Sequence, residues 1–124
     1  MSASTTINTP DRYELFVLPG DAKKLEIEKD TRIPNAATFK IQLEDHTLGN
    51  LLRMEMLRQS HVQFAGYKVP HPLEHYFLLK VQTSKNSTPV EALKNGINQL
   101  ITDISSLEAQ FQAEMGKFTS TNQF

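Results

Sequence analysis

The side chains of this sequence that could do chemistry are concentrated in one short stretch, E-D-H-T-L-G-N-L-L-R at residues 44–53. Two carboxylates, an imidazole, a hydroxyl and an amide fall within seven positions: Glu44, Asp45, His46, Thr47 and Asn50. Such groups can act as general acid, general base or nucleophile. However, the sequence carries no glycine-rich anion loop or nucleophile elbow that would complete such a site.

The same polar groups suit the start of a helix. Asp45 or Thr47 would cap the first turn with a side-chain oxygen, and acidic groups are stabilised by the positive end of a helix. This interpretation needs no further residues elsewhere in the chain. We therefore predict a helix start at this stretch, and we expect the chain to contain no catalytic residue.

The histidines raise the question of a metal site. His71 and His75 are four residues apart, which is a ligand spacing on a helix. Pro70 and Pro72 make that segment a loop, and the two other histidines flank the predicted first helix. The chain has no cysteine to complete a set of ligands. We therefore expect neither a metal site nor a cofactor.

Length and composition restrict the class of protein. The 124 residues are typical of one domain. The formal net charge is −1, whereas free-standing nucleic-acid-binding proteins usually carry a basic excess, so we expect no direct contact with nucleic acid. No apolar run approaches the ~20 residues that cross a bilayer, and we expect no membrane association. The absence of cysteine suits a reducing compartment.

The elements that must position these residues can be predicted from periodicity. A short aromatic and extended segment at residues 12–18 comes first. Gly66 lies inside a predicted strand, where glycine often marks a bulge or the close approach of another backbone. Alternation of apolar and polar residues predicts four strands, at residues 24–29, 38–43, 62–69 and 76–83.

Helical periodicity predicts two helices, at residues 47–59 and 89–115, the second ending near Gly116. The order β-β-α-β-β-α predicts an α+β fold in which a mainly antiparallel four-stranded sheet carries both helices on one face. The domain would span residues 10–118, between a flexible lead-in at residues 1–9 and a flexible tail at residues 119–124.

The first predicted helix carries an apolar stripe formed by Leu48, Leu51, Leu52 and Met56. Gly49 interrupts its first turn, where glycine costs about 1 kcal/mol relative to alanine. Close approach of another backbone is the usual compensation, and we expect such an approach at Gly49.

The second predicted helix begins with T-P-V-E at residues 88–91, a capping box with proline at the first helical position. Thr88 would accept a bond from an early N–H, and the Glu91 side chain would reach back to the cap. Ile101 broadens an apolar seam whose members are spaced 4, 3, 4, 3 and 4 residues apart, as in a coiled coil: Leu93, Ile97, Leu100, Ile104, Leu107 and Phe111.

This helix is too long for the sheet beneath it. Residues 89–115 would extend about 40 Å, whereas an eight-residue strand spans only about 26 Å. The seam continues into the overhang, where leaving Leu107 and Phe111 in water would forfeit ~1.5–3 kcal/mol each. We therefore predict that a helix of another chain covers the overhang.

Two sequence blocks resemble a known family. Residues 44–53 are similar to the signature of the alpha-like subunits of cellular RNA polymerases, in which H-T-L-G-N opens the dimerisation helix. F-A-G-Y-K-V-P-H-P at residues 64–72 resembles a second block of that family. P-D-R-Y-E-L-F at residues 10–16 and P-N-A at residues 34–36 resemble the small alpha-like subunits of eukaryotic RNA polymerase II.

The resemblance implies the alpha-subunit dimerisation fold without its inserted second domain. It implies a non-catalytic nuclear subunit that forms an obligate heterodimer with the larger alpha-like subunit. That heterodimer would be the assembly platform for the two large catalytic subunits, with the second-largest subunit among its contacts. Two alternatives stay open, the equivalent small subunit shared by polymerases I and III and a free-standing homodimeric scaffold.

The same resemblance assigns a partner-interface role to the two helices. Their apolar residues would pack against equivalent helices of the partner. The predicted interface consists of Leu48, Gly49, Leu51, Leu52, Met56, Leu93, Ile97, Leu100, Ile101, Ile104, Leu107 and Phe111.

Overall fold

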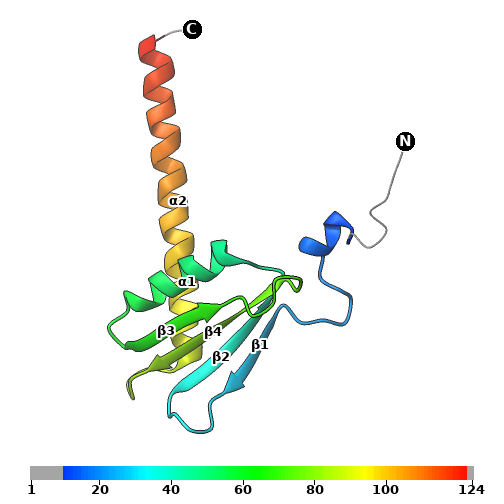
Figure 1. Cartoon of the computed structure of the whole chain (residues 1–124). Coiled ribbons are helices and arrows are strands. Elements are labelled where there is room, and N and C mark those ends of the chain that lie inside the picture. Colours follow the sequence, from blue (N-terminus) through cyan, green and yellow to red (C-terminus); the bar gives the residue numbers. More distant parts are fainter. Residues whose placement is uncertain (1–9, 123–124) are drawn as a thin grey trace, which may run out of the picture.

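The computed structural model of the chain describes residues 10–122, so the predicted lead-in at residues 1–9 lies outside the described residues. The predicted order β-β-α-β-β-α is confirmed (Figure 1). The segment before the first strand is a short 3-10 helix rather than extended chain. The elements in chain order are η1 (Arg12–Leu15), β1 (Leu25–Lys29), β2 (Ala36–Gln42), α1 (His46–Leu57), β3 (Val62–Lys68), β4 (Tyr76–Thr83) and α2 (Pro89–Asn122).

The four strands form one antiparallel sheet in the order β1-β2-β4-β3, so β1 and β3 are its edges. The register between β3 and β4 shifts between Val62 and Phe64. Gly66 pairs regularly with Lys80, so of the two features that a strand glycine often marks, the bulge does not occur at Gly66. The close neighbour of Gly66 is a side chain, because an added Cβ would lie 3.1 Å from Cζ of Phe64.

The core lies between one face of the sheet and both helices, as predicted. Alternate residues of β2 and β4 point to this face and are buried, because strand side chains alternate between the two faces. β1 presents Leu25 and Ile27 to the same face, opposite Ile41 and Phe39, but both stay exposed because the helices lie over the other strands. The core side chains are Ala37, Phe39, Ile41, Leu52, Met56, Ala65, Phe77, Leu79, Val81, Ala92 and Leu93.

The helix α2 starts against the sheet and then extends far beyond it (Figure 1). The Thr88 hydroxyl accepts a hydrogen bond from the Glu91 N–H at 3.2 Å, which confirms the predicted cap. With 34 residues, α2 is about 50 Å long at ~1.5 Å per residue. Within residues 10–122, no helix combines the length and apolar character that crossing a bilayer requires.

The predicted end of α2 near Gly116 is wrong. Gly116 lies inside the helix and its φ is not positive, so it does not form the left-handed cap that ends many helices. Residues 119–122, which we expected to belong to a flexible tail, are the last turn of α2. Residues 123–124 lie outside the described part of the chain.

Candidate partner interface

The polar stretch at the start of α1 is built from separate local contacts. The Asp45 carboxylate accepts a hydrogen bond from the Thr47 N–H at 2.9 Å and caps α1, so Asp45 rather than Thr47 is the cap. This bond to the Thr47 backbone lowers the pKa of Asp45 below its usual value. Glu44 forms an ion pair with Lys24, with 3.1 Å between Nζ and Oε1.

The remaining polar groups of the stretch have other partners. His46 Nδ1 lies 2.9 Å from the Tyr67 hydroxyl. The Asn50 side-chain oxygen accepts bonds from Nε and Nη2 of Arg53, at 3.2 and 2.8 Å. Among residues 10–122, no three metal-ligating side chains lie together. We therefore interpret the stretch as the start of α1, which it connects to Lys24, directly before β1, and to Tyr67 of β3.

An apolar groove of about 330 Å³ runs between α1, α2 and the β1–β2 side of the sheet, and we call it the helix groove. One wall comes from α1 and the other from α2, while buried residues of the core form the floor. Lys24 is the only charged residue of its lining. The other lining residues are Leu25, Ile41, Leu48, Leu51, Leu52, Leu93, Ile97, Leu100, Ile101 and Ile104.

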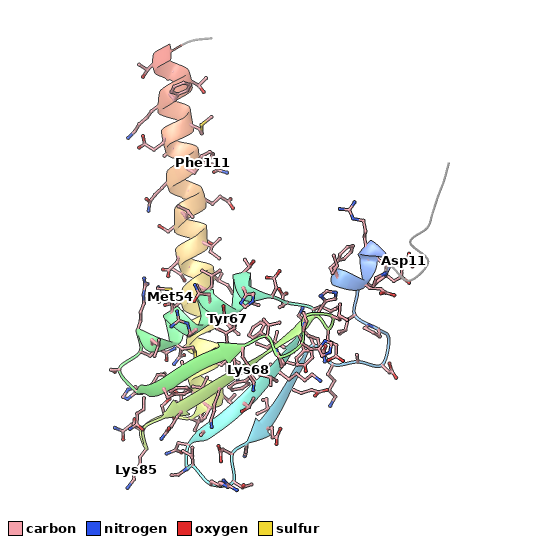
Figure 2. The ribbon with its side chains drawn as sticks, in the orientation of Figure 1. Asp11, Met54, Tyr67, Lys68, Lys85 and Phe111 are labelled. Atoms are coloured by element: carbon pink, nitrogen blue, oxygen red, sulfur yellow. The ribbon has the colours of Figure 1, made fainter. Side chains whose placement is uncertain are left out.

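Beyond the helix groove, the apolar seam of α2 continues as a distal stripe, which consists of Ile104, Leu107, Phe111 and Met115. Leu107 and Phe111 are 67% and 65% exposed. Figure 2 shows Phe111 on the part of α2 that stands clear of the sheet. The groove and the stripe therefore form one continuous apolar surface along α1 and α2.

Four residues of the predicted interface face the domain's own core instead. Leu52, Met56 and Leu93 are 2%, 0% and 4% exposed, because the stripes of both helices must also cover the sheet. Gly49 is buried against the ring of Tyr67, so the expected close approach comes from a side chain of β3 rather than from another backbone. In this conformation a partner can reach Leu48, Leu51 and the exposed residues of α2, but not Met56 or Gly49.

Sequence reasoning missed the contribution of β1 to this surface. Leu25 lines the helix groove, and Ile27 is exposed on the same face of the sheet. The alternation of β1 placed both residues on one face, but it did not reveal that β1 is an edge strand that no helix covers.

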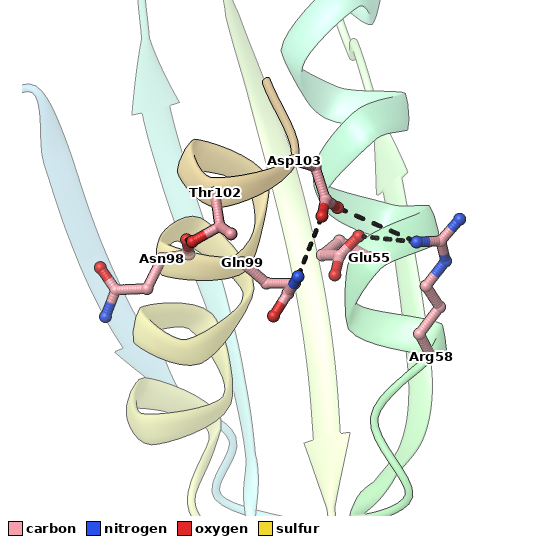
Figure 3. A network of polar contacts seen from close by, with 6 residues as sticks. All are labelled: Glu55, Arg58, Asn98, Gln99, Thr102 and Asp103. Carbon is pink, nitrogen blue, oxygen red and sulfur yellow. Dashed lines mark hydrogen bonds and ion pairs between the residues drawn. The ribbon is translucent and has the colours of Figure 1, made fainter. Parts of the chain in front are cut away.

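Polar side chains link α2 to the end of α1 near the point where α2 leaves the sheet (Figure 3). We call this network of Glu55, Arg58, Gln99 and Asp103 the polar bridge. Nη1 of Arg58, the residue that caps the C-terminal end of α1, lies 3.5 Å from Glu55 Oε2 and 4.0 Å from Asp103 Oδ2. Gln99 donates a hydrogen bond to Asp103 Oδ1 at 2.9 Å. Since Arg58 is largely exposed, these ion pairs contribute little to stability. Burial of Ala92 and Leu93 determines which face of α2 turns to the core.

Deeper contacts hold the first turns of α2 against α1. Gln59 donates a hydrogen bond to the Ala92 carbonyl at 2.8 Å. At Gly96 the helices are so close that an added Cβ would lie 3.0 Å from the sulfur of Met56. The start of α2 is therefore fixed rigidly to α1, and this fixes the direction in which the distal stripe projects.

Comparison with known proteins agrees with this geometry. Residues 36–110 match the family described as the RNA polymerase Rpb3/Rpb11 dimerisation domain. This chain belongs to that family. The Rpb3/Rpb11 match begins at β2 and ends within α2, so it includes most of the helix groove and the first part of the distal stripe.

Relatives with the name RPB11 match nearly the whole chain. A probable DNA-directed RNA polymerase II subunit RPB11 of Caenorhabditis elegans is 50% identical over 115 residues, which cover 93% of each chain. The RNA polymerase II subunit rpb11 of Dictyostelium discoideum is 46% identical over 90% of this chain and 92% of its own length. RPB11 of Schizosaccharomyces pombe is 43% identical, with 87% of each chain covered.

A solved structure shares the fold. DNA-directed RNA polymerase subunit L of Thermoplasma acidophilum superimposes with a TM-score of 0.65 at 28% identity. The match covers 77% of this chain and 92% of the archaeal subunit. The Rpb3/Rpb11 fold of this chain therefore extends to polymerase subunits outside the eukaryotes.

Proposed function

We propose that this chain is the small alpha-like subunit of RNA polymerase II and that it forms an obligate heterodimer with the larger alpha-like subunit. The heterodimer is the platform on which the two large catalytic subunits assemble in the nucleus. The chain contributes no catalytic residue and no direct contact with nucleic acid. The polymerase II names of its relatives support this assignment over a subunit shared by polymerases I and III.

The observation that carries the proposal is the continuity of the helix groove with the distal stripe. Leu107 and Phe111 alone would contribute ~1.5–3 kcal/mol each on full burial. Obligate interfaces are typically apolar and bury ~2,000 Å² or more, which suits a surface that follows two helices rather than one pocket. A partner helix in the groove would contact Leu51 and Ile101 first and then follow α2 outward.

The two parts of the surface have different roles in this proposal. The groove is concave and bounded by α1 and α2, so it determines where a partner helix is seated. The distal stripe is the side of a single helix, and it pairs with a helix of the partner through knobs-into-holes packing. A partner that binds only the folded chain stabilises it by mass action, so the stability of the chain is linked to the concentration of its partner.

The proposal can be tested by co-expressing the chain with a tagged larger alpha-like subunit. Ile104→Asp places a charge where the groove meets the stripe, and it should abolish co-purification because binding would bury that charge without a partner. Ser105→Asp is the matched control, since Ser105 is exposed on the outer side of α2. Both variants should keep the wild-type circular dichroism.

Two results would contradict the proposal. One is normal recovery of the Ile104→Asp chain with the larger subunit. The other is a wild-type chain that ignores the larger subunit and elutes as a stable homodimer, which would favour the free-standing scaffold.

A further inference from the structure

Gly49 has the tightest surroundings of any glycine that the structure describes. A Cβ added at Gly49 would lie 2.6 Å from Cδ2 and 2.7 Å from Cε2 of the Tyr67 ring. Real contacts of a Cβ are essentially never shorter than 3.0 Å, so either the ring or α1 would have to move. Gly20, in contrast, has no neighbour within 4 Å of the same construction.

The Tyr67 ring cannot retreat from α1 without disturbing the core. Its other side meets Phe77 edge-on, with ring centroids 6.0 Å apart and an angle of 80° between the planes. Phe77 is completely buried on β4. The ring is therefore fixed between the first turn of α1 and the centre of the domain, where interior packing leaves little free space.

His46 fixes the outer end of the same ring. Its Nδ1 lies 2.9 Å from the Tyr67 hydroxyl, and the two rings meet edge-on with centroids 5.6 Å apart. Tyr67 thus contacts the first residue of α1 through its hydroxyl and Gly49, one turn further on, through its ring edge. Because α1 contacts the Tyr67 side chain at two points, these contacts define both the distance of α1 from β3 and the tilt of α1.

We propose that His46, Gly49 and Tyr67 form a positioning latch that sets α1 relative to the sheet and so gives the helix groove the shape its partner requires. Tyr67 does not line the groove, but Leu48, directly before Gly49, and Leu51, two residues after it, do. A movement of α1 away from Tyr67 changes the position of both leucines. This inference rests on the proposed function, because the partner of the groove is the larger alpha-like subunit.

Competition during assembly tests the latch. A limiting amount of tagged larger alpha-like subunit is co-expressed with the wild-type chain and one full-length variant, and mass spectrometry gives the ratio captured. Gly49→Ala should be captured about tenfold less than wild type or worse, which is the usual scale for overpacking a close contact. Gly20→Ala makes the same change in open space and should be captured equally.

The deciding variant combines Gly49→Ala with Tyr67→Val. Valine suits a strand and lacks the ring atoms that meet the added methyl group. Tyr67→Val alone should weaken capture, whereas in the Gly49→Ala chain it should restore part of the loss. If the two losses simply add, Gly49 and Tyr67 act independently of each other, and that result would overturn the latch. Equal capture of Gly49→Ala and wild type would overturn it as well.

Amide hydrogen exchange of the chain alone separates this inference from the proposed function. The amides of α1 should exchange faster in Gly49→Ala and slow again in the double variant. If the wild-type chain is not captured by the larger subunit, the proposed function is wrong, and the exchange pattern still decides whether the latch holds α1. Unchanged exchange in Gly49→Ala would overturn the latch.

Discussion

The two halves of α2 follow one heptad pattern in opposite surroundings. In the first half, Ala92 and Leu93 are buried under the sheet and beside α1. In the second half, Leu107 and Phe111 continue the seam to which Leu93 belongs, and they remain about two-thirds exposed. Apolar spacing therefore defines a face of a helix but not the molecule that covers it.

The polar contacts of the two halves also differ. The first half is held from outside the helix by Gln59 and, through the polar bridge, by Arg58. The polar pairs of the second half join residues of α2 to each other, such as Lys117 with Glu114 at 3.3 Å and Gln110 with Ser106 at 3.0 Å. The first half is therefore part of the fold, whereas the second extends beyond it with its apolar side chains exposed, and we propose that the partner docks there.

The largest expected effect separates the two halves directly. Leu93→Asp should destabilise the free chain by about 3–5 kcal/mol, because it buries a charge without a partner. Leu107→Asp changes an exposed seam residue in the same way, and it should leave the unfolding free energy within ~0.5 kcal/mol of wild type. Urea titration of both variants measures the difference. Similar losses would show that the distal half also belongs to the fold.

The next effect concerns the distal half and its partner. Phe111→Ala should weaken binding of the larger alpha-like subunit by about 1.5–3 kcal/mol, the scale of burying one large apolar side chain. Gln112→Ala, one position along on the polar side, is the control and should bind normally. Competitive capture from cells that express both chains gives the ratio. Equal capture of Phe111→Ala and wild type would show that the stripe does not face the partner.

A smaller effect is expected at the start of the first half. Thr88→Ala removes the hydroxyl that caps α2 and should cost about 1 kcal/mol of folding stability. Thr102→Ala removes only a bond to the Asn98 carbonyl inside the exposed helix, so it should change stability little. Thermal unfolding can compare them. If Thr102→Ala cost as much as Thr88→Ala, the Thr88 hydroxyl would have no special role as the cap of α2.

The smallest expected effect is a dependence of folding stability on pH, through Asp45 at the start of α1. The helix α1 in turn packs against the first half of α2. The bond from the Thr47 N–H holds the pKa of Asp45 below its usual value of 3.8. A lowered pKa in the folded state contributes stability that is complete above pH 3.8 and is lost as the pH falls through the folded-state value. Asp45→Asn should therefore flatten the acid side of the stability curve. If Asp45→Asn left the acid side of the stability curve unchanged, the Asp45 carboxylate would not contribute to stability as the cap of α1.

Much of the fold could be predicted because local signals agreed with each other. The alternation at Tyr76–Thr83 and the proline after Thr88 gave the bounds of β4 and the start of α2. The end of α2 was predicted wrongly at Gly116, because a glycine ends a helix only where the chain adopts a left-handed conformation. No packing or proline forces that conformation at Gly116, so α2 continues to Asn122.

The apolar surface was predicted less completely than the fold. Periodicity identified Leu51 and Leu107 together with Leu52 and Met56, since all four lie on apolar stripes. Only the placement of the sheet decides that Leu52 and Met56 are covered by their own domain. The contact between Gly49 and Tyr67 was also invisible, because the two residues belong to elements that meet only in the folded chain.

The distal stripe has a consequence for a chain that has not met its partner. Such a chain displays Leu107, Phe111 and Met115 on a rigid helix in water. A preformed apolar surface of this kind promotes aggregation and attracts chaperones, because removing apolar surface from water is favourable in free energy. Unassembled copies are therefore the form most exposed to quality control. The amount of this chain that persists in a cell should follow the supply of its partner.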